Sequence, residues 1–433
     1  MKSLRAVRSK AALFGLVLTL GAVWTKRANA EVTLVKTDDV EFFTSGRVGG
    51  FFSYGFGDGY PIPLHAAAGE SIRPGGGFDP GPDTIPQKGA NGMDDSTVQG
   101  KFRSMRLRSG FVPNVLGFGM RTHLTPTTEL TAFISIWTTI EAKDGRKTTP
   151  IEPDAREGYG KLQGPWGTFL AGRALDLFSR GATENNFLYG HGYALGYPGT
   201  ITNAGPTAGL IGFGVLAAFF SPGIMYSTPT LGGVQLSVGV YDPVPAPGNW
   251  EATREARPET ELTYDLQTSS VKLHLFANGA VQKLYHTAVT EGTTAYGAGY
   301  GGRVEVGPFH LGVAGHYGKG LGLSYALETS PTTFSQANDM RTFDGYSAFA
   351  QYSTGRFDFN LGAGISRVFL LDSDKAATDS SLIKNQLGMA AVAVYHASKH
   401  AHFSLDYFRG QFKWYVGEKQ NVNFISSGMT VTW

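Results

Sequence analysis

The sequence predicts an all-β fold, a transmembrane antiparallel β-barrel of about 16 strands with short periplasmic turns and long extracellular loops, one of them folded into the lumen. Three observations lead to this prediction. Apolar and polar residues alternate with period two along most of the chain. Short connections alternate with long ones, as in outer-membrane barrels. Glycine, at 59 of 433 residues, accompanies 29 Phe and 19 Tyr, which suits aromatic-rich strands joined by many turns.

Residues 1–30 have the layout of a secretory signal peptide. Basic residues come first, an apolar run from Ala11 to Trp24 follows, and Ala28-Asn29-Ala30 supplies small residues for cleavage. We expect the barrel to comprise residues 31–433, beginning at Glu31. The apolar run is short for a membrane span, although two basic residues near the cleavage site leave an uncleaved anchor as the alternative.

Removing this segment changes the charge balance. The chain has 37 basic and 35 acidic side chains, and six of the basic ones but none of the acids precede Glu31, so 31 basic and 35 acidic residues remain and the net charge falls from +2 to −4. No nucleic-acid partner is indicated. The chain contains no cysteine, which fits an exported protein that avoids disulfide chemistry, and no motif calls for a cofactor.

Alternation defines the strands in order. In the first, even positions such as Phe42, Val48 and Phe52 are apolar and polar residues separate them. GGVQLSVGVYD, SVKLHLFANG and RFDFNLGAGIS repeat the pattern. The predicted strands are 40–56, 115–124, 129–141, 156–163, 167–173, 222–229, 232–242, 258–267, 270–283, 295–306, 308–318, 344–353, 356–368, 386–397, 401–416 and 423–433. A missed pair would change the total to about 14 or 18.

The connections separate the two ends of the barrel. LTPTTEL, TPTLGGV and STGRF are tight turns, and the long loops cover 57–113, 174–221, 243–257, 320–343 and 369–384. Within the long loops, GLIGFGVLAAFF (209–220) is the longest apolar run after residue 30. It is too short for a membrane-spanning helix, which needs about 20 residues. We expect it to pack on the inner wall or at a subunit contact, or to form a short helix.

Several stretches, taken in order, resemble the general diffusion porins of Gram-negative outer membranes. VLGFGMRTHLTPTTELTAFISIWTTIE is similar to the second and third strands of that family, REGYGKLQGPWGTFLAGRALDLF to the fourth and fifth, and HASKHAHFSLDYF to the last periplasmic turn. The resemblance implies a homotrimeric outer-membrane channel, without enzymatic activity, for passive diffusion of small hydrophilic solutes and ions. It also implies that the third long loop, 174–221, narrows the lumen and carries acids that face wall arginines.

The wall arginines match the family only in part. Arg156 occupies one of the family's positions, but Val115 and Ser227 occupy two others. Arg121 shares the parity of the glycines at 117 and 119 and is expected to face the lumen. Arg106 and Arg108 either supply further lumen charge or form a solvated basic patch in the first long loop.

The third long loop supplies the remaining candidates for the constriction. Arg173 begins the inward turn, and Asp176, Glu184, Asn185 and Asn186 follow it. For each acid the alternative is an exposed loop carboxylate. The resemblance implies that Trp433, which stands where the family usually ends in Phe, is read by the outer-membrane barrel assembly machinery.

Other motifs carry less chemistry. GAGYGG (297–302) lies within an alternating stretch rather than between a strand and a helix. Asp372, Asp374 and Asp379 are spaced loosely like a calcium loop but lack its glycine and distal glutamate. The ten histidines show no metal-binding spacing, and no G-x-S-x-G is present. A substrate-specific channel, a barrel lipase or protease, and a secreted β-binding module remain as alternative functions.

Overall fold

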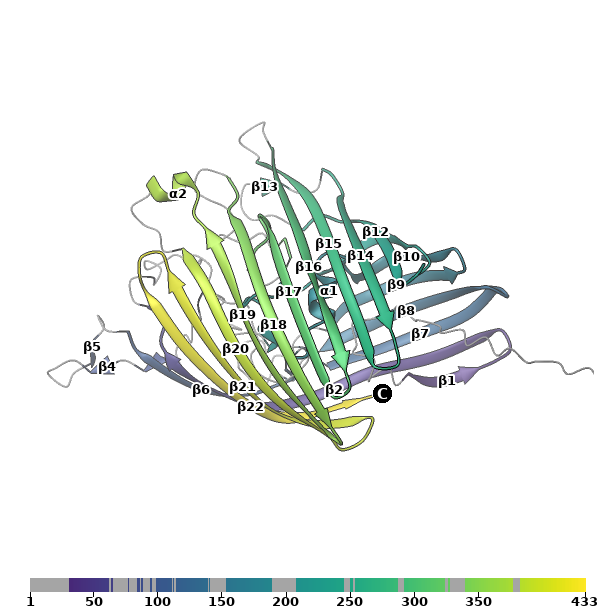
Figure 1. The fold of residues 1–433 in the computed structure, drawn as a ribbon, viewed down its shortest axis with the longest axis horizontal. Coiled ribbons are helices and arrows are strands. Elements are labelled where there is room, and N and C mark those ends of the chain that lie inside the picture. Colours follow the sequence, from purple (N-terminus) through teal and green to yellow (C-terminus); the bar gives the residue numbers. More distant parts are fainter. Residues whose placement is uncertain are drawn as a thin grey trace, which may run out of the picture.

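The computed structural model describes residues 31–61, 64, 77, 84–85, 87–88, 94–95, 99–110, 112, 114–138, 140, 153–188, 208–244, 250–251, 254–286, 292–323, 326–327, 339–376 and 382–433. They form a closed antiparallel barrel whose strands tilt across the molecule (Figure 1). The predicted signal peptide and the middle of the third long loop lie outside these residues. Among the described segments, no helix is long and apolar enough to cross a membrane.

Neighbouring strands in the wall are mostly consecutive in sequence. The wall strands are β2 (Val40–Asp58), β6 (Lys101–Arg108), β7 (Asn114–Thr125), β8 (Thr128–Thr138), β9 (Asp154–Gly164), β10 (Gly167–Leu175), β11 (Phe220–Ser227), β12 (Val234–Tyr241), β14 (Arg257–Gln267), β15 (Val271–His286), β16 (Gly292–Val306), β17 (Phe309–Lys319), β18 (Thr342–Thr354), β19 (Phe357–Phe369), β20 (Ile383–His396), β21 (Ala401–Trp414) and β22 (Lys419–Thr432). Short additions are β1 (Val32–Lys36), β3 (Thr84–Ile85), β4 (Gln87–Lys88), β5 (Asp94–Asp95), β13 (Trp250–Glu251), α1 (Arg180–Glu184), η3 (Ala208–Leu210) and α2 (Asp372–Ala376).

The barrel closes where β2 pairs with β22, from Arg47 opposite Thr432 to Gly57 opposite Val422. The other edge of β2 pairs first with β7 and then with β6, so these two segments occupy one position in the wall. Counting them together, the barrel has the predicted 16 strands. Closure leaves no open edge at this seam, which a membrane-spanning sheet requires.

Strand β6 corrects one predicted boundary. Residues 57–113 were expected to form a single loop, but Lys101–Arg108 pair with Asp58–Phe51. The segment KFRSMRLR contains four cations, which obscure the apolar periodicity of a lipid-facing strand. Arg106 and Arg108 therefore lie in the wall and not in the first long loop.

The period-two pattern separates an outer and an inner face. Phe42, Val48 and Phe52 in β2 are exposed, whereas Phe43 and Phe51, with the opposite parity, are buried. Leu311 and Val313 in β17, Leu361 in β19 and Leu405 in β21 are likewise exposed on the outer face. An outward apolar face is what a lipid-embedded barrel needs.

The apolar stretch 209–220 packs on the inner wall, one of the two places expected for it. Phe213 is fully buried, and its ring makes edge contacts with Phe408 and Phe412 of β21, with centroid separations of 5.0 and 5.5 Å. Gly214 has a φ of 93°, and a Cβ there would lie 2.1 Å from the carbonyl oxygen of Tyr346. Only glycine fits this approach of loop backbone to strand backbone.

Candidate functional site

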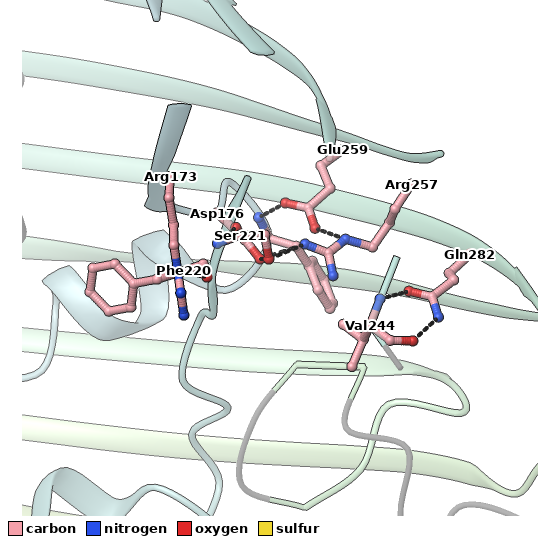
Figure 2. A network of polar contacts seen from close by, with 9 residues as sticks. Arg173, Asp176, Phe220, Ser221, Val244, Arg257, Glu259 and Gln282 are labelled. Atoms are coloured by element: carbon pink, nitrogen blue, oxygen red, sulfur yellow. Dashed lines mark hydrogen bonds and ion pairs between the residues drawn. The ribbon is translucent and has the colours of Figure 1, made fainter. Parts of the chain in front are cut away.

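The third long loop leaves the wall after β10 and returns at β11, and its two ends are fastened together. The backbone N–H of Asp176 donates to the carbonyl oxygen of Phe219 at 2.8 Å. The Asp176 carboxylate accepts from the backbone N–H of Ser221 at 2.9 Å and from the Ser221 hydroxyl at 2.7 Å. The loop is thus closed at its base by residues that adjoin the two strand ends (Figure 2).

Arg257 of β14 completes this network. Its Nη2 donates to Asp176 at 2.5 Å and to the Ser221 hydroxyl at 2.9 Å, and its Nε lies 2.9 Å from Oε1 of Glu259. The other oxygen of Glu259 accepts the backbone N–H of Phe178 at 2.8 Å. Figure 2 shows the guanidinium between the two carboxylates. We call Asp176, Ser221, Arg257 and Glu259 the loop anchor.

The loop anchor is withdrawn from water. Arg257 is 1% exposed and Asp176 2% exposed. Burial raises the pKa of Asp176 to about 6, while Arg257 and the donors of Ser221 act in the opposite direction. Above that pH the carboxylate is ionised and paired, and such a buried pair is held by its geometry and its additional hydrogen bonds. The loop anchor fixes the loop and presents no free charge to a passing solute.

A second ion pair joins the loop to β14, and here the cation belongs to the loop and the acid to the strand. Nε of Arg180 in α1 donates to Oε2 of Glu261 at 2.9 Å, and Nη2 also pairs with that oxygen. Glu261 is 2% exposed. The family resemblance implies acids on the loop and arginines on the wall, whereas here the loop contributes Asp176 and Arg180 and the wall contributes Arg257, Glu259 and Glu261.

The three remaining loop candidates are held within the loop or against its wall. Asn186 is 2% exposed; its amide donates to the carbonyl oxygen of Gly209 and accepts from the N–H of Leu188. Asn185 is also buried. The carbonyl oxygen of Glu184 accepts from Arg303 of β16 at 3.4 Å, and burial raises the pKa of the Glu184 carboxyl.

Arg156 lies on β9, which is separated from β14 by β10, β11 and β12. A β-bulge in β9, where Ser135 faces Glu157 but Trp137 faces Asp154, changes the local alternation. The Arg156 guanidinium lies 4.4 Å from the ring centroid of Trp137, and its Nε donates to Asp154 at 2.8 Å. Trp137 is 6% exposed. The bulge therefore turns Arg156 toward the side occupied by the buried Trp137.

Arg121 and Arg106 belong to the same region of the wall. Arg121 lies over the ring of Phe43 at 4.0 Å and pairs with Glu31. Arg106 pairs in register with Ser53 of β2, whose side chain is buried. For Arg108, the register places the backbone opposite Phe51. Together, the four arginines predicted for the wall lie on β6, β7 and β9, in one continuous part of the sheet.

Arg173 is separate from both groups. It is exposed and shares the parity of the exposed Phe169 in β10. Its Nε donates to the carbonyl oxygen of Phe220 at 3.1 Å. Alternation places it on the outer side of β10.

Val115 and Ser227, the two positions that depart from the family pattern, make contacts that involve no charged side chain. Val115 packs in a small buried cluster with Val112 and Trp137. The hydroxyl oxygens of Ser227 and Ser237 are 2.7 Å apart. These positions therefore add no cation to the inner wall.

Sequence reasoning missed Ser221, Arg257, Glu259, Arg180 and Glu261. A usable signal was present in RPETEL, where Arg257, Glu259 and Glu261 occupy alternate positions of one predicted strand and so share a face. Three charges on one face of a membrane strand indicate the lumen side. Their loop partners could not be identified from that pattern.

The described residues contain no group of His, Asp or Glu side chains arranged to hold a metal ion. In the calcium-like stretch, Asp374 receives two hydrogen bonds from Arg341, each 2.8 Å long, which lowers the pKa of the Asp374 carboxyl below its usual value. Asp372 pairs with Lys375 at 2.8 Å. Asp379 lies outside the described residues. GAGYGG lies within β16, as predicted.

Comparison with known proteins adds a family and a set of related folds. Residues 62–320 match the sequence profile of the Gram-negative porins. The outer membrane channel DcaP of Acinetobacter baumannii superposes with a TM-score of 0.63 at 14% identity, over 93% of this chain and 100% of that chain.

Two further structures share the fold. The anion-selective porin from Comamonas acidovorans gives a TM-score of 0.58 at 13% identity, over 91% and 100% of the two chains. OmpF of Salmonella typhi, in complex with daunomycin, gives 0.53 at 11% identity, over 92% and 99%. A search of curated protein sequences gave no match.

Proposed function

Because this chain belongs to the Gram-negative porin family, we propose that its channel prefers anions and small neutral solutes over cations. The protein is an outer-membrane porin, and its barrel encloses a water-filled channel for passive diffusion of small hydrophilic solutes. The preference among those solutes is the proposal. A substrate-specific channel is the alternative within the same fold, and enzymatic hydrolysis of lipid or peptide by the folded barrel would be evidence for a barrel enzyme.

The observation that supports anion preference is the gathering of Arg106, Arg121 and Arg156 on β6, β7 and β9, away from the buried ion pairs of the loop. In the loop anchor and the Arg180–Glu261 pair, opposite charges are buried against each other. On β6 to β9, 32% of the Arg156 side chain and 24% of the Arg121 side chain remain exposed, beside partner carboxylates Asp154 and Glu31 that are 42% and 36% exposed. Arg106, which shares the inward parity of the buried Phe102, is an additional exposed cation on this part of the wall. Exposed cations that line a narrow aqueous passage favour anions.

The test is ion selectivity measured across a planar lipid bilayer. Purified porin should give stepwise conductance, and the reversal potential in a salt gradient should indicate anion preference. Arg156→Ala and Arg121→Ala should each shift that potential toward cations, because each leaves a neighbouring carboxylate without its arginine. Arg173→Ala serves as the control and should leave the potential unchanged.

An unchanged reversal potential in both wall variants, with normal folding, would contradict the proposal. The bilayer recordings also test the constriction, through the size of the single-channel conductance. If loop 174–221 narrows the passage opposite the wall arginines, Arg156→Ala and Arg121→Ala should each change that conductance.

We also propose that the protein is a homotrimer exported by its first 30 residues. The family resemblance supports the trimer, and the charged, apolar and small-residue order of the N-terminus supports the signal peptide. The role of Trp433 in assembly stays a prediction of the resemblance.

A further inference from the structure

Charge is distributed very unevenly on the outer surface of the barrel. Most outward side chains are apolar, but a group of exposed cations occupies the extracellular ends of strands that adjoin at the β2–β22 seam. These strands adjoin in the order β21, β22, β2 and β6, and Figure 1 shows β6, β21 and β22 on the same side of the barrel. The group comprises Lys101 and Arg103 in β6, Arg409 and Lys413 in β21, and Lys419 in β22. We call it the outer basic patch.

Strand pairing brings these cations together. Lys413 lies opposite Lys419, and Arg409 lies opposite Asn423. Asn423 in turn pairs with Phe56, which pairs with Arg103. Arg409 and Arg103 therefore stand in one row across four adjacent strands, roughly 15 Å apart at the usual strand spacing.

Carboxylates do not balance this charge. Asp58, the one acid with an outward position here among the described residues, pairs with Lys101 and accepts two hydrogen bonds from Asn421 at 2.9 and 3.1 Å. Glu418, in the turn between β21 and β22, is partly exposed and forms no ion pair with the described residues. Over the described part of the chain, Arg103, Arg409, Lys413 and Lys419 form no ion pair.

Outward cations elsewhere on the barrel are paired with carboxylates. Lys283 pairs with Glu255 at 3.1 Å and Lys319 pairs with Asp339 at 2.7 Å. Arg367 donates to Asp344 at 2.8 Å. Among the cations that flank the outer face in the described ranges, the outer basic patch is thus the group with a surplus of positive charge.

The patch lies at the level of the lipid headgroups. Below it, the outward positions of β22 from Trp433 to Ile425 are apolar except for Ser427, and the aromatic residues Tyr407 and Phe56 follow. The step from Trp433 to Asn423 covers about 26 Å along the barrel axis for strands tilted by about 40°, close to the height of the apolar band of such barrels. The Tyr407 hydroxyl donates to Asn423 at 2.8 Å, at the boundary between ring and polar group.

We propose that the outer basic patch binds phosphate groups of anionic lipids in the outward-facing leaflet of the membrane. Guanidinium and ammonium groups at headgroup level attract phosphate, and arginine can bind it through two parallel hydrogen bonds. A second copy of the chain fits this patch poorly. Within the described ranges, the carboxylates that flank the outer face, Asp58, Glu255 and Asp339, are each already paired with a lysine.

The test uses the folded, full-length porin in detergent with lipid A as the probe and dephosphorylated lipid A as the comparison. The phosphorylated lipid should remain bound through gel filtration, and raising the salt from 0.1 to about 1 M should release most of it because screening weakens surface attraction. In Arg103→Gln/Arg409→Gln/Lys413→Gln/Lys419→Gln, retained lipid should fall about tenfold or more. Lys283→Gln/Lys319→Gln is the matched control and should retain it.

Three results would overturn the proposal. These are equal retention of the dephosphorylated lipid, binding to the unmodified porin that does not respond to salt, and full retention by the quadruple variant. If the quadruple variant instead keeps its lipid and loses its oligomeric state, the patch is a subunit contact. Arg409→Gln/Lys413→Gln provides a milder pair if the quadruple variant does not fold, and single-channel conductance, which the outer face should not affect, verifies the fold.

Discussion

At the scale of single residues, the loop anchor depends on one guanidinium between two carboxylates. Arg257 is buried between Asp176 and Glu259, and its charge favours the ionised form of both acids. Asp176 and Arg257 are 81 positions apart in the sequence. Parity could assign Arg257 to the inner face, but no local pattern could identify its partner, so the loop anchor was beyond sequence reasoning.

Replacing Arg257 should release the loop. Arg257→Ala removes the cation shared by two buried acids, and breaking such a buried pair typically costs about 3–5 kcal/mol. We expect faster limited proteolysis within residues 176–219 and a noisier open-channel current. Lys272→Ala, in the neighbouring β15, is the control, because it removes an exposed inward cation with a 3.5 Å contact to Glu305. It should change neither the proteolysis rate nor the current noise. If Arg257→Ala and Lys272→Ala behave alike, Arg257 does not hold the loop.

At the scale of elements, alternation predicted most wall strands because every second residue of a lipid-facing strand must be apolar. It failed at β6, where Lys101 and Arg103 share the outward face with Met105 and Leu107. That failure and the outer basic patch have the same cause. A strand that ends among headgroups exchanges apolar side chains for cations and so loses the pattern by which strands are recognised.

The closing seam makes an element-level prediction. A Cβ on Gly46 would lie 2.3 Å from the indole of Trp433, whereas a Cβ on Gly50, on the same face of β2, would meet only Ile140 at 3.8 Å. Gly46→Val should displace the indole from the seam and so destabilise the barrel. When samples are heated to increasing temperatures before gel electrophoresis, the compact, fast-migrating band of this variant should therefore disappear at a lower temperature. Gly50→Val is the matched control, and an equal shift in both would show that the indole contact is unimportant.

At the scale of the whole molecule, the fold class and strand number were predictable because closure, alternation and loop asymmetry constrain one another. These constraints act within one chain and do not say which surface contacts another chain. On the outer face of β9, Cβ atoms added at Gly158 and Gly160 would meet nothing within 4 Å, so this part of the wall is flat. A flat outward surface suits close approach of another barrel.

The proposed homotrimer leads to a prediction at this scale. Gly158→Trp/Gly160→Trp, which adds bulk to that surface without touching the lumen, should reduce the mass of the detergent-solubilised particle from three chains to one. Light scattering coupled to gel filtration measures that mass. Thr260→Trp, on the outer face of β14, serves as the control and should leave the particle intact; a single-chain mass for the unmodified porin would exclude the trimer.

The packing of residues 209–220 on β21 has a consequence for engineering. Deleting that loop segment to obtain a wider pore would uncover Phe408 and Phe412, which are now 0% and 1% exposed, and leave their rings in contact with water. The loop and the strands behind it belong to one buried apolar cluster. A wider passage would thus require new polar residues on the strands as well as a shorter loop.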